Sequence, residues 1–358
     1  MTAAPLRVVV VDDSAAHRSA LTELLEDIDG VHVVARAADG DEALQRCFEL
    51  RPDLVTLDLE MPRMDGFTFL RLLMARQPTP VLVVSGRSGR QDVFRALELG
   101  ALDFVARPAG AGVAELDAMR ADLRAKVELV RQLSPAAGLR GASHTVTGRF
   151  AVVGASARAV PQPGVAIEPS RLVVVGASTG GPSALVELFA ALPSSSRLCI
   201  VVAQHMPERF TRSFAERLDR LGGVRVREAR DGEPIVAGTG LVCPGGRVAS
   251  VERGPAGSLR LRTAEPDSSD RYVPSVDRLF RSAAACVGPR LVAVVLTGMG
   301  DDGARGVHAV ADAGGLVIAE SERSAVVHGM PGAALRTGRV HRCLTLHEII
   351  AEIAALDG

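Results

Sequence analysis

Val173-Val174-Val175-Gly176-Ala177-Ser178-Thr179-Gly180-Gly181 is the stretch that decides how the second half of this chain folds. An apolar, β-branched run breaks into small residues, and a helical pattern follows from Pro182. This pattern predicts a strand, a tight turn and a helix start, with the Ser178 hydroxyl at the carboxyl end of the strand. The unpaired N–H groups of a helix N-terminus favour anionic oxygens, so a nucleophile and an oxyanion site can share this turn. The alternative is a glycine-rich turn that only lets helix and strand pack closely.

The composition is that of a globular protein with room for two domains. The chain has 358 residues, of which 47% are hydrophobic and 23% are charged. The formal net charge of -1 gives no broad surface for nucleic acid. With no Trp and one Tyr, stacking on bases is also unexpected. We therefore expect a protein that does not bind nucleic acid.

The cysteines and the apolar runs indicate a cytoplasmic protein. The cysteines are odd in number and form no C-x-x-C pair, which is typical of reduced thiols in the cytosol. They are Cys47, Cys199, Cys243, Cys286 and Cys343. No run approaches the length of about 18 apolar residues that a membrane span needs, and the N-terminus lacks a basic region followed by a long apolar segment. We therefore expect neither a membrane span nor a signal peptide. We expect a monomer that does not insert into membranes.

Residues 6 to about 133 alternate short apolar runs with segments of helical period. The predicted strands are Leu6–Val11, Val31–Arg36, Leu54–Leu57, Pro80–Val84 and Ala101–Val105. The predicted helices are Ser14–Asp27, Asp41–Leu50, Gly66–Arg76, Arg90–Leu99 and Val113–Leu133. Five β–α repeats predict an α/β fold, a doubly wound parallel sheet whose site lies at the carboxyl ends of the strands.

A change of composition separates the two halves. Residues 134–170 are rich in Ala, Gly, Ser and Pro, so we expect a first domain at 1–133, a flexible linker, and a second α/β domain at 171–358. Val152-Val153-Gly154-Ala155-Ser156 in the linker repeats the letters of Val174–Ser178. It lacks the Thr-Gly-Gly and the helical pattern that follow Ser178, so we interpret Ser156 as a chance repeat.

Several polar residues of the first half follow its predicted strands. Asp12 and Asp13 follow the first strand, Asp58 the third, Ser85 the fourth and Arg107 the fifth. Converging carboxylates repel one another and need a cation, and Mg²⁺ prefers oxygen ligands. Asp58 can then attack a phosphoryl group and form an acyl phosphate. The alternative is that the three aspartates are only helix caps and loop carboxylates.

The first half resembles the receiver domain of bacterial two-component response regulators. The motifs that carry the resemblance are Val10-Val11-Asp12-Asp13-Ser14, Asp58-Leu59-Glu60-Met61-Pro62 and Asp65-Gly66. The resemblance implies a flavodoxin-like fold, phosphorylation of Asp58 by a histidine kinase, and Mg²⁺ held by Asp12, Asp13 and Asp58. It also implies switch roles for Ser85, Phe104 and Arg107. Receivers carry a lysine where this chain has Arg107, and the guanidinium is longer, planar and forked.

A nucleophilic Ser178 needs a base and an orienting carboxylate. His205 is the best-placed histidine, because Leu198–Ala203 is a predicted buried strand that ends just before it. The carboxylate is expected in Thr297-Gly298-Met299-Gly300-Asp301-Asp302-Gly303, which follows the apolar run Leu291–Leu296. Backbone N–H groups near Met299 can help to hold an oxyanion. We interpret His17, His32 and His144 as solvated or structural.

A second assignment of the triad remains open at this point. Gly176-x-Ser178-x-Gly180 also fits the nucleophile elbow of α/β-hydrolases, whose order is Ser, acid, His. Ser178, Asp302 and then His328 or His341 satisfy that order. Neither histidine ends a clear strand, and no His-Gly-Gly-Gly loop precedes Ser178. A mononucleotide site is weaker still, since no Lys-Ser or Lys-Thr completes a phosphate loop.

The second half resembles the catalytic domain of the chemotaxis protein-glutamate methylesterase (CheB) family, which has a Rossmann-like α/β fold. The matching motifs are Gly176–Gly181, Gln204–Pro207, Pro244-Gly245-Gly246, Pro274-Ser275-Val276-Asp277, Leu296–Gly303 and Met330-Pro331. By this resemblance Ser178 is the nucleophile, His205 the base and Asp302 the acid, with Thr179 and Met299 beside the oxyanion. Val273 stands where the family often has arginine or histidine.

The two resemblances together imply a phosphorylation-activated signalling hydrolase. It would remove methyl esters from glutamate side chains of chemoreceptors, releasing methanol, and would deamidate receptor glutamines, with no cofactor in the hydrolase domain. The unphosphorylated receiver is expected to cover the active site. The competing functions are a phospho-dependent, non-catalytic scaffold and a transcription factor. An intact Ser178, His205 and Asp302 argue against the scaffold, and the second half has no helix-turn-helix or basic helix.

Overall fold

The computed structural model describes residues 4–86, 90–108, 110, 112–132, 167–254 and 257–356. The chain divides into two compact units, residues 1–143 and 144–358, and each is described by itself. Most of the predicted linker, with Ser156 and His144, lies outside the described residues.

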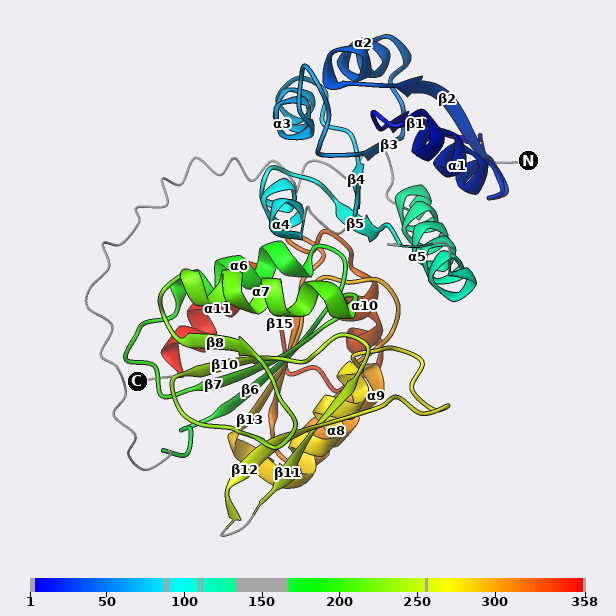
Figure 1. Cartoon of the computed structure of the whole chain (residues 1–358). Helices are drawn as coiled ribbons and strands as arrows, with labels where there is room; N and C mark the ends of the chain where they lie inside the picture. The colour runs from blue at the N-terminus through cyan, green and yellow to red at the C-terminus, as the bar shows by residue number, and fades with distance from the viewer. Residues whose placement is uncertain are drawn as a thin grey trace. The chain divides into compact units, whose positions relative to one another are not determined.

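The first unit is one parallel sheet with helices between its strands (Figure 1). Its strands are β1 (Leu6–Val11), β2 (Val31–Ala37), β3 (Leu54–Leu57), β4 (Val81–Ser85) and β5 (Asp103–Ala106). Its helices are α1 (Ala15–Glu26), α2 (Gly40–Leu50), α3 (Gly66–Arg76), α4 (Arg90–Glu98) and α5 (Val113–Gln132). The order β2-β1-β3-β4-β5 is that of a flavodoxin-like sheet. The predicted doubly wound fold is confirmed.

The core of this unit explains why the apolar runs form strands. Val8 and Val10 of β1 are fully buried and belong to one cluster with Leu54, Leu82 and Leu123. Strands that are buried on both faces read as continuous apolar runs, as these do. The sequence had indicated that Ser85 follows the fourth strand. In the structure Ser85 is instead the last residue of β4.

The second unit is built around a larger parallel sheet. Its strands are β6 (Leu172–Ala177), β7 (Cys199–Gln204), β8 (Arg225–Glu228), β9 (Glu233–Pro234), β10 (Thr239–Val242), β11 (Val248–Arg253), β12 (Leu259–Ala264), β13 (Leu291–Val295), β14 (Leu316–Glu320) and β15 (Arg342–Leu344). Its helices are α6 (Gly181–Ala191), α7 (Glu208–Arg220), α8 (Val276–Val287), α9 (Ala304–Asp312), α10 (Gly329–Arg336) and α11 (Leu346–Ala355), with a 3₁₀ turn at Gly288–Arg290.

Seven of these strands form the order β15-β14-β13-β6-β7-β10-β8, and β11, β12 and β9 form a small antiparallel sheet. Helices α6 and α7 lie on one face of the large sheet, and α8 and α9 on the other (Figure 1). The sequence had predicted the α/β class, and that is confirmed. The antiparallel sheet was not predicted.

Strand pairing places the candidate site at the carboxyl ends of β13, β6 and β7. The parallel register of β6 and β7 ends with Ala177 opposite Gln204, so Ser178 and His205 are the next residues on neighbouring strands. Gly176 allows α8 to approach β6, because a Cβ there would lie 2.3 Å from Val276 Cγ1.

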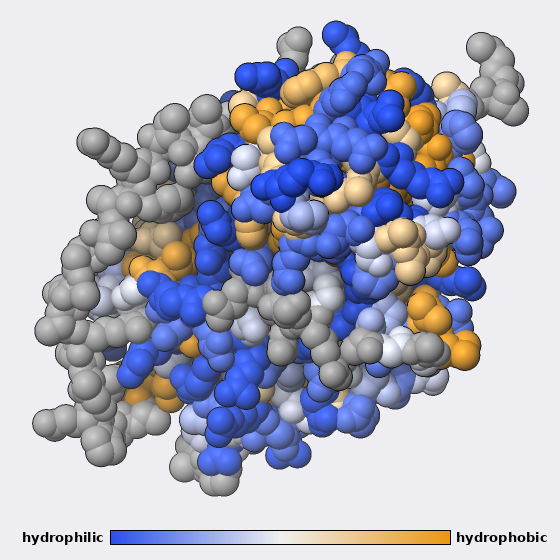
Figure 2. Space-filling model, turned by 45° about the horizontal axis from the view of Figure 1, so that its top comes forward, coloured by the Kyte–Doolittle hydropathy of each residue, from blue (hydrophilic) through white to orange (hydrophobic). Residues whose placement is uncertain are grey.

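The surface is mostly hydrophilic on the face that Figure 2 shows, with scattered apolar groups between charged residues. Within the described part of the chain, no helix is both long and apolar enough to cross a membrane.

Candidate functional site

The first unit brings its three predicted aspartates together. Asp12 and Asp13 follow β1 and Asp58 follows β3, and these two strands are paired up to Val11 and Leu57. One carboxylate oxygen of each aspartate lies within 4.8 Å of the others. Burial raises the pKa of Asp12, Asp58 adds to the rise, and the Arg107 guanidinium opposes it. Three converging oxygen donors with mutual repulsion suit a hard divalent cation.

Arg107 reaches into this cluster from the loop after β5. Its Nη2 donates to Asp12 Oδ2 at 2.9 Å, to Asp58 Oδ2 at 3.0 Å and to the Val84 carbonyl oxygen at 3.2 Å. Its Nη1 lies 2.6 Å from His17 Nδ1. The forked guanidinium thus contacts two carboxylates and an imidazole at once. Sequence reasoning missed this role of His17, since a histidine in the first turn of a helix carries no signal of a contact ninety residues away.

Ser85 and Phe104, two of the three predicted switch residues, lie in the neighbouring strands β4 and β5. Ser85 ends β4 and is buried, and its Oγ donates to the Gly86 carbonyl oxygen at 3.4 Å. Phe104 lies in β5 with a buried ring, and Lys126 of α5 lies over that ring, its Nζ 5.3 Å from the centroid. The Lys126 ammonium also contacts the Phe104 carbonyl oxygen.

In the second unit, Ser178 occupies the turn between β6 and α6. Its backbone N–H donates to the Thr297 carbonyl oxygen at 3.1 Å, and its own carbonyl oxygen accepts from Gly181 N at 2.8 Å. Gly180 has a φ of +79°, in the left-handed region that glycine adopts without a steric penalty. The turn therefore needs its small residues, and it presents Ser178 just before the helix begins.

Gln204 ties the serine turn to the histidine turn. Its Nε2 donates to the Ser178 carbonyl oxygen at 2.9 Å and to the His205 carbonyl oxygen at 3.0 Å. A Cβ on Gly181 would lie 2.1 Å from Gln204 Oε1, so only glycine leaves room for this side chain. The sequence had marked Gln204 as part of a motif but had given it no role.

His205 and Asp302 form the best-defined side-chain contact of the site. His205 Nε2 lies 2.8 Å from Asp302 Oδ2, and Asp302 is buried. With Nε2 taken by the carboxylate, Nδ1 is the ring nitrogen that remains for proton transfer. This arrangement can orient an imidazole that acts as a base.

The Asp302 carboxylate is held by the start of α8. Its Oδ2 accepts from Val276 N at 2.8 Å, and its Oδ1 accepts from Asp277 N at 2.9 Å and Gly303 N at 3.0 Å. The N–H groups and the dipole of a helix N-terminus favour a negative charge. The Pro-Ser-Val-Asp motif thus supplies the helix start that fixes the acid, and Ser275 is its N-cap.

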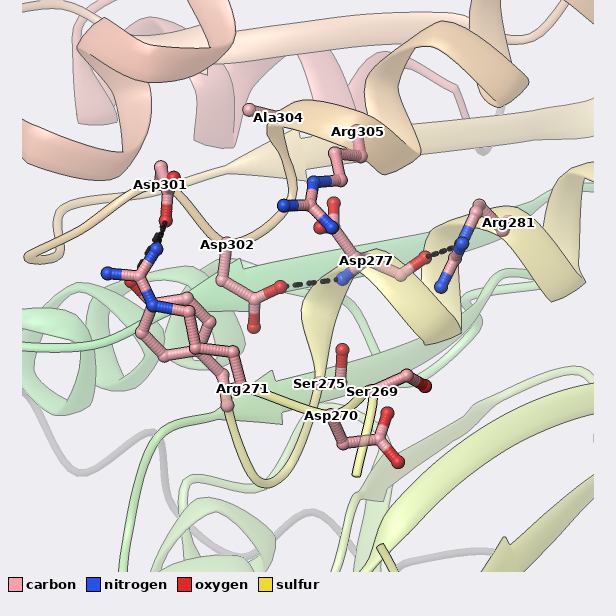
Figure 3. A pocket seen from close by; sticks show the side chains of 11 residues that line it. Ser269, Asp270, Arg271, Ser275, Asp277, Arg281, Asp301, Asp302, Ala304 and Arg305 are labelled. Atoms are coloured by element: carbon pink, nitrogen blue, oxygen red, sulfur yellow. Dashed lines mark hydrogen bonds and ion pairs between the residues drawn. The ribbon is translucent and has the colours of Figure 1, made fainter. Parts of the chain in front are cut away.

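Asp301 is arranged differently from its neighbour. Its side chain is exposed, and Oδ1 accepts from Tyr272 Oη at 2.9 Å and from Arg271 Nη1 at 3.3 Å. Figure 3 shows the Asp301 and Asp302 carboxylates in different directions, the first toward Arg271 and the second toward the start of α8 at Asp277. A pocket beside Asp302 is lined by Ser269, Asp270, Arg271, Tyr272, Ser275, Asp277, Arg281, Asp301, Ala304 and Arg305.

The two histidines of the alternative triad have other surroundings. His341 Nδ1 accepts from Val317 N at 3.0 Å, and Val317 lies near the amino end of β14, at the opposite edge of the sheet from Asp302. His328 pairs through its backbone with Gly298, and its Nε2 is buried without a hydrogen-bond partner. The contacts of Asp302 described above are with His205 and with backbone N–H groups.

The loop that contains Met299 lies against Ser178. A Cβ on Gly298 would be 2.9 Å from Ser178 Cβ, so glycine permits this close approach. Thr297 Oγ1 donates to the Thr179 carbonyl oxygen at 2.9 Å, which joins the two loops. Thr179 is buried and Met299 is half-buried. Both residues expected beside an oxyanion therefore belong to loops that meet at Ser178.

Sequence reasoning also missed Tyr272. Its ring stacks on the His205 imidazole with centroids 5.1 Å apart and an angle of 4° between the planes. The signal that could have identified it was its rarity, because it is the only tyrosine of the chain and stands two residues before Pro-Ser-Val-Asp.

Comparison with known proteins gives a family match for each of the two units. Residues 173–353 match the CheB methylesterase family, and residues 8–117 match the response regulator receiver domain. A protein-glutamate methylesterase/protein-glutamine glutaminase of Anaeromyxobacter dehalogenans is 53% identical over 97% of this chain and 95% of its own. One of Myxococcus xanthus is 48% identical over 98% of this chain and 97% of its own.

A solved structure agrees with these matches. The CheB methylesterase catalytic domain of Thermotoga maritima is 36% identical, with a TM-score of 0.50, and covers 52% of this chain and 98% of that domain. Since the sequence relatives span nearly the whole chain and the family match covers its second half, the chain belongs to the CheB methylesterase family and carries a receiver domain at its N-terminus.

Proposed function

We propose that this protein hydrolyses γ-methyl esters of glutamate side chains in chemoreceptors and deamidates receptor glutamines, under control of its receiver domain. The observation that carries the proposal is the His205–Asp302 contact beside the Ser178 turn. The names of the relatives, which pair the methylesterase and glutaminase activities, support the substrate class.

The proposed chemistry is acyl transfer through Ser178. His205 takes the hydroxyl proton as Ser178 Oγ attacks the ester carbonyl carbon, and N–H groups near Thr179 and Met299 hold the oxyanion. Collapse of the tetrahedral intermediate breaks the bond to the methoxy oxygen, and His205 returns the proton so that methanol leaves. Water then attacks the acyl-enzyme by the reverse path and releases glutamate. A glutamine substrate follows the same steps and releases ammonia.

The receiver is proposed to regulate this reaction through Asp58. Asp58 takes a phosphoryl group from a histidine kinase, and Asp12, Asp13 and Asp58 would hold the Mg²⁺ that neutralises charge during the transfer. Arg107, which touches Asp12 and Asp58, would contact the phosphoryl oxygens, with Ser85 and Phe104 passing the change to the surface. The unphosphorylated receiver would cover the active site. We propose that the receiver domain ends near residue 133 and that the catalytic domain begins near residue 171.

The hydrolase domain is proposed to need no cofactor, because the proposed base and its orienting carboxylate both come from the chain itself. We also propose a cytoplasmic, monomeric protein. Its partners would be methyl-accepting chemoreceptors and a histidine kinase.

Release of methanol from methylated receptor membranes tests the proposal directly. The purified full-length protein should release methanol, and a small-molecule phosphodonor with Mg²⁺ should increase the rate. An Asp58→Asn protein should keep the unstimulated rate and lose the increase. Absence of methanol release under both conditions would favour the non-catalytic scaffold.

A further inference from the structure

A single contact with Asp302 leaves the plane of the His205 imidazole undetermined. The hydrogen bond ties Nε2 to Asp302 Oδ2 at 2.8 Å, and the ring is otherwise held only through Cβ, so it can still turn about the bond between Cβ and Cγ. Such a rotation would move Nδ1, the nitrogen that remains for proton transfer. A base must be held within hydrogen-bond reach of the proton that it takes, so a second contact is required to fix the ring.

We propose that Tyr272 is that contact and acts as a positioning residue for His205; this inference rests on the proposed triad. The rings are nearly parallel, at 4°, with centroids 5.1 Å apart, within the range of attractive aromatic pairs. Rotation of the imidazole out of this plane would push its edge into the tyrosine ring. The stack therefore limits the imidazole to the plane in which Asp302 holds one nitrogen.

Tyr272 is itself anchored to the loop that carries the acid. Its Oη donates to Asp301 Oδ1 at 2.9 Å, and Asp301 directly precedes Asp302. Asp301 thus holds the tyrosine ring, and Asp302 holds the imidazole. Because the two aspartates are consecutive, one stretch of backbone sets the spacing of the two rings. Arg271 adds a contact, with its Cζ 5.1 Å from the Tyr272 centroid and its Nη1 3.3 Å from Asp301 Oδ1.

Gly300 makes room for the tyrosine hydroxyl. A Cβ at this position would lie 2.6 Å from Tyr272 Oη, and the φ of +90° also favours glycine. Burial and the bond to Asp301 raise the pKa of Tyr272, so the hydroxyl remains a donor at neutral pH. These features indicate that the loop with Gly300 and Asp301 is shaped to accept the Tyr272 side chain.

The first test uses variants of the full-length protein in the methanol-release assay. Tyr272→Phe keeps the stacked ring and loses the bond to Asp301, whereas Tyr272→Leu loses the ring. We expect kcat of Tyr272→Phe within about threefold of wild type, and kcat of Tyr272→Leu lower by about 10- to 100-fold with little change in KM, the scale of a misplaced catalytic group. Equal kcat in the two variants, or an effect confined to KM, would overturn the positioning role.

The second test needs no turnover. With one Tyr and no Trp, the tyrosine emission of the protein reports on Tyr272 alone. Removal of a ring that contacts the phenol changes the surroundings of that phenol, so the emission of His205→Gln should differ from that of wild type at the same pH. Equal emission from the two proteins would show that the two rings do not stack in solution.

Labelling with a fluorophosphonate separates this inference from the proposed function. Wild-type protein should be labelled at Ser178, Tyr272→Phe should be labelled at a similar rate, and Tyr272→Leu more slowly by the same factor as kcat. Labelling of wild type that persists in Ser178→Ala would contradict the triad itself. Labelling of Ser178 with equal rates in the Phe and Leu variants would contradict only the role of Tyr272.

Discussion

Ser178 and Ser156 have the same four residues before them and different residues after them. Ser178 continues β6 beside the loop of Met299, whereas Ser156 lies outside the described residues. Replacement of Ser178 by alanine should lower methanol release by on the order of 10⁶-fold, the cost of removing a triad serine. The thermal unfolding of the variant should match wild type, since the hydroxyl is not part of the core.

The matched control for this substitution is Ser156→Ala. It should leave the rate of methanol release nearly unchanged. A Ser178→Ala protein that keeps a substantial part of the wild-type rate would show that another residue is the nucleophile.

The two adjacent aspartates should differ sharply on substitution. Asp302 is buried and bonded to His205, whereas Asp301 is exposed and bonded to Tyr272 and Arg271. Asp302→Asn should lower kcat by about 10⁴-fold, as loss of the orienting acid does in a serine protease. Asp301→Asn keeps an oxygen that accepts from Tyr272 and should cost far less. The reverse order of kcat values would assign the acid to Asp301.

At the scale of elements, Glu320 links the ends of β14 and β13. It is buried, its Oε2 accepts from Thr297 N at 2.8 Å, and its Oε1 accepts from Ser324 Oγ at 2.9 Å. Burial raises its pKa above the ordinary 4.5, and Glu187 adds to the rise. Because the folded state binds this proton more tightly than the unfolded state, the stability that the group contributes is full below pH 4.5 and is lost as the pH rises through the folded pKa.

Glu320→Gln should remove that dependence while keeping an oxygen for Thr297 N. The free energy of unfolding of the Gln variant should therefore increase relative to that of wild type as the pH rises from about 4.5 toward 8. Denaturant unfolding of the second unit at several pH values measures this difference. A difference that stays constant over the range would show that burial does not hinder the ionisation of Glu320.

The helices and strands of the first unit lie within two residues of their predicted bounds. Buried parallel strands read as unbroken apolar runs, so β1 and β3 have the predicted bounds and β6, β7 and β13 lie within a residue or two of them. The alternating burial of β12, at Leu259–Ala264, was a readable period of two that the prediction did not use. Strand β9 has two residues, Glu233–Pro234, and offers no pattern at all.

The candidate site was predictable where it depends on strand ends. Ser178 and His205 were chosen because each follows an apolar strand, and Asp302 was chosen over Asp301 from the family resemblance. The structure brings His205 and Asp302 into contact. Contacts between distant side chains, such as Tyr272 with His205, depend on how loops meet in three dimensions. No local pattern of residues encodes them, which is why Tyr272 and the role of Gln204 were missed.

At the scale of the whole molecule, Arg107 connects the receiver chemistry to the proposed control of the hydrolase. It bonds Asp12 and Asp58 through Nη2 and reaches His17 through Nη1. A lysine has one compact ammonium and cannot make the whole set. A switch responds to the difference in contact energy between its states, so stimulation of methanol release by a phosphodonor should change by more than about twofold in Arg107→Lys. The unstimulated rate should change little.

A protein that starts at Arg171 provides the control. It should release methanol at a rate that a phosphodonor does not alter. Equal stimulation of wild type and Arg107→Lys would show that the guanidinium and the ammonium are interchangeable at this position.

The register of β6 and β7 has a mechanical consequence. Because Ser178 and His205 directly follow the last paired residues, Ala177 and Gln204, their separation is set by the distance between neighbouring strands, about 4.8 Å in any sheet. Paired strands in the middle of a sheet hold this backbone spacing when loops at the surface move. A regulatory domain can therefore change how often a substrate reaches the site, while the backbone spacing of the nucleophile and the base stays the same in the unstimulated and the stimulated enzyme.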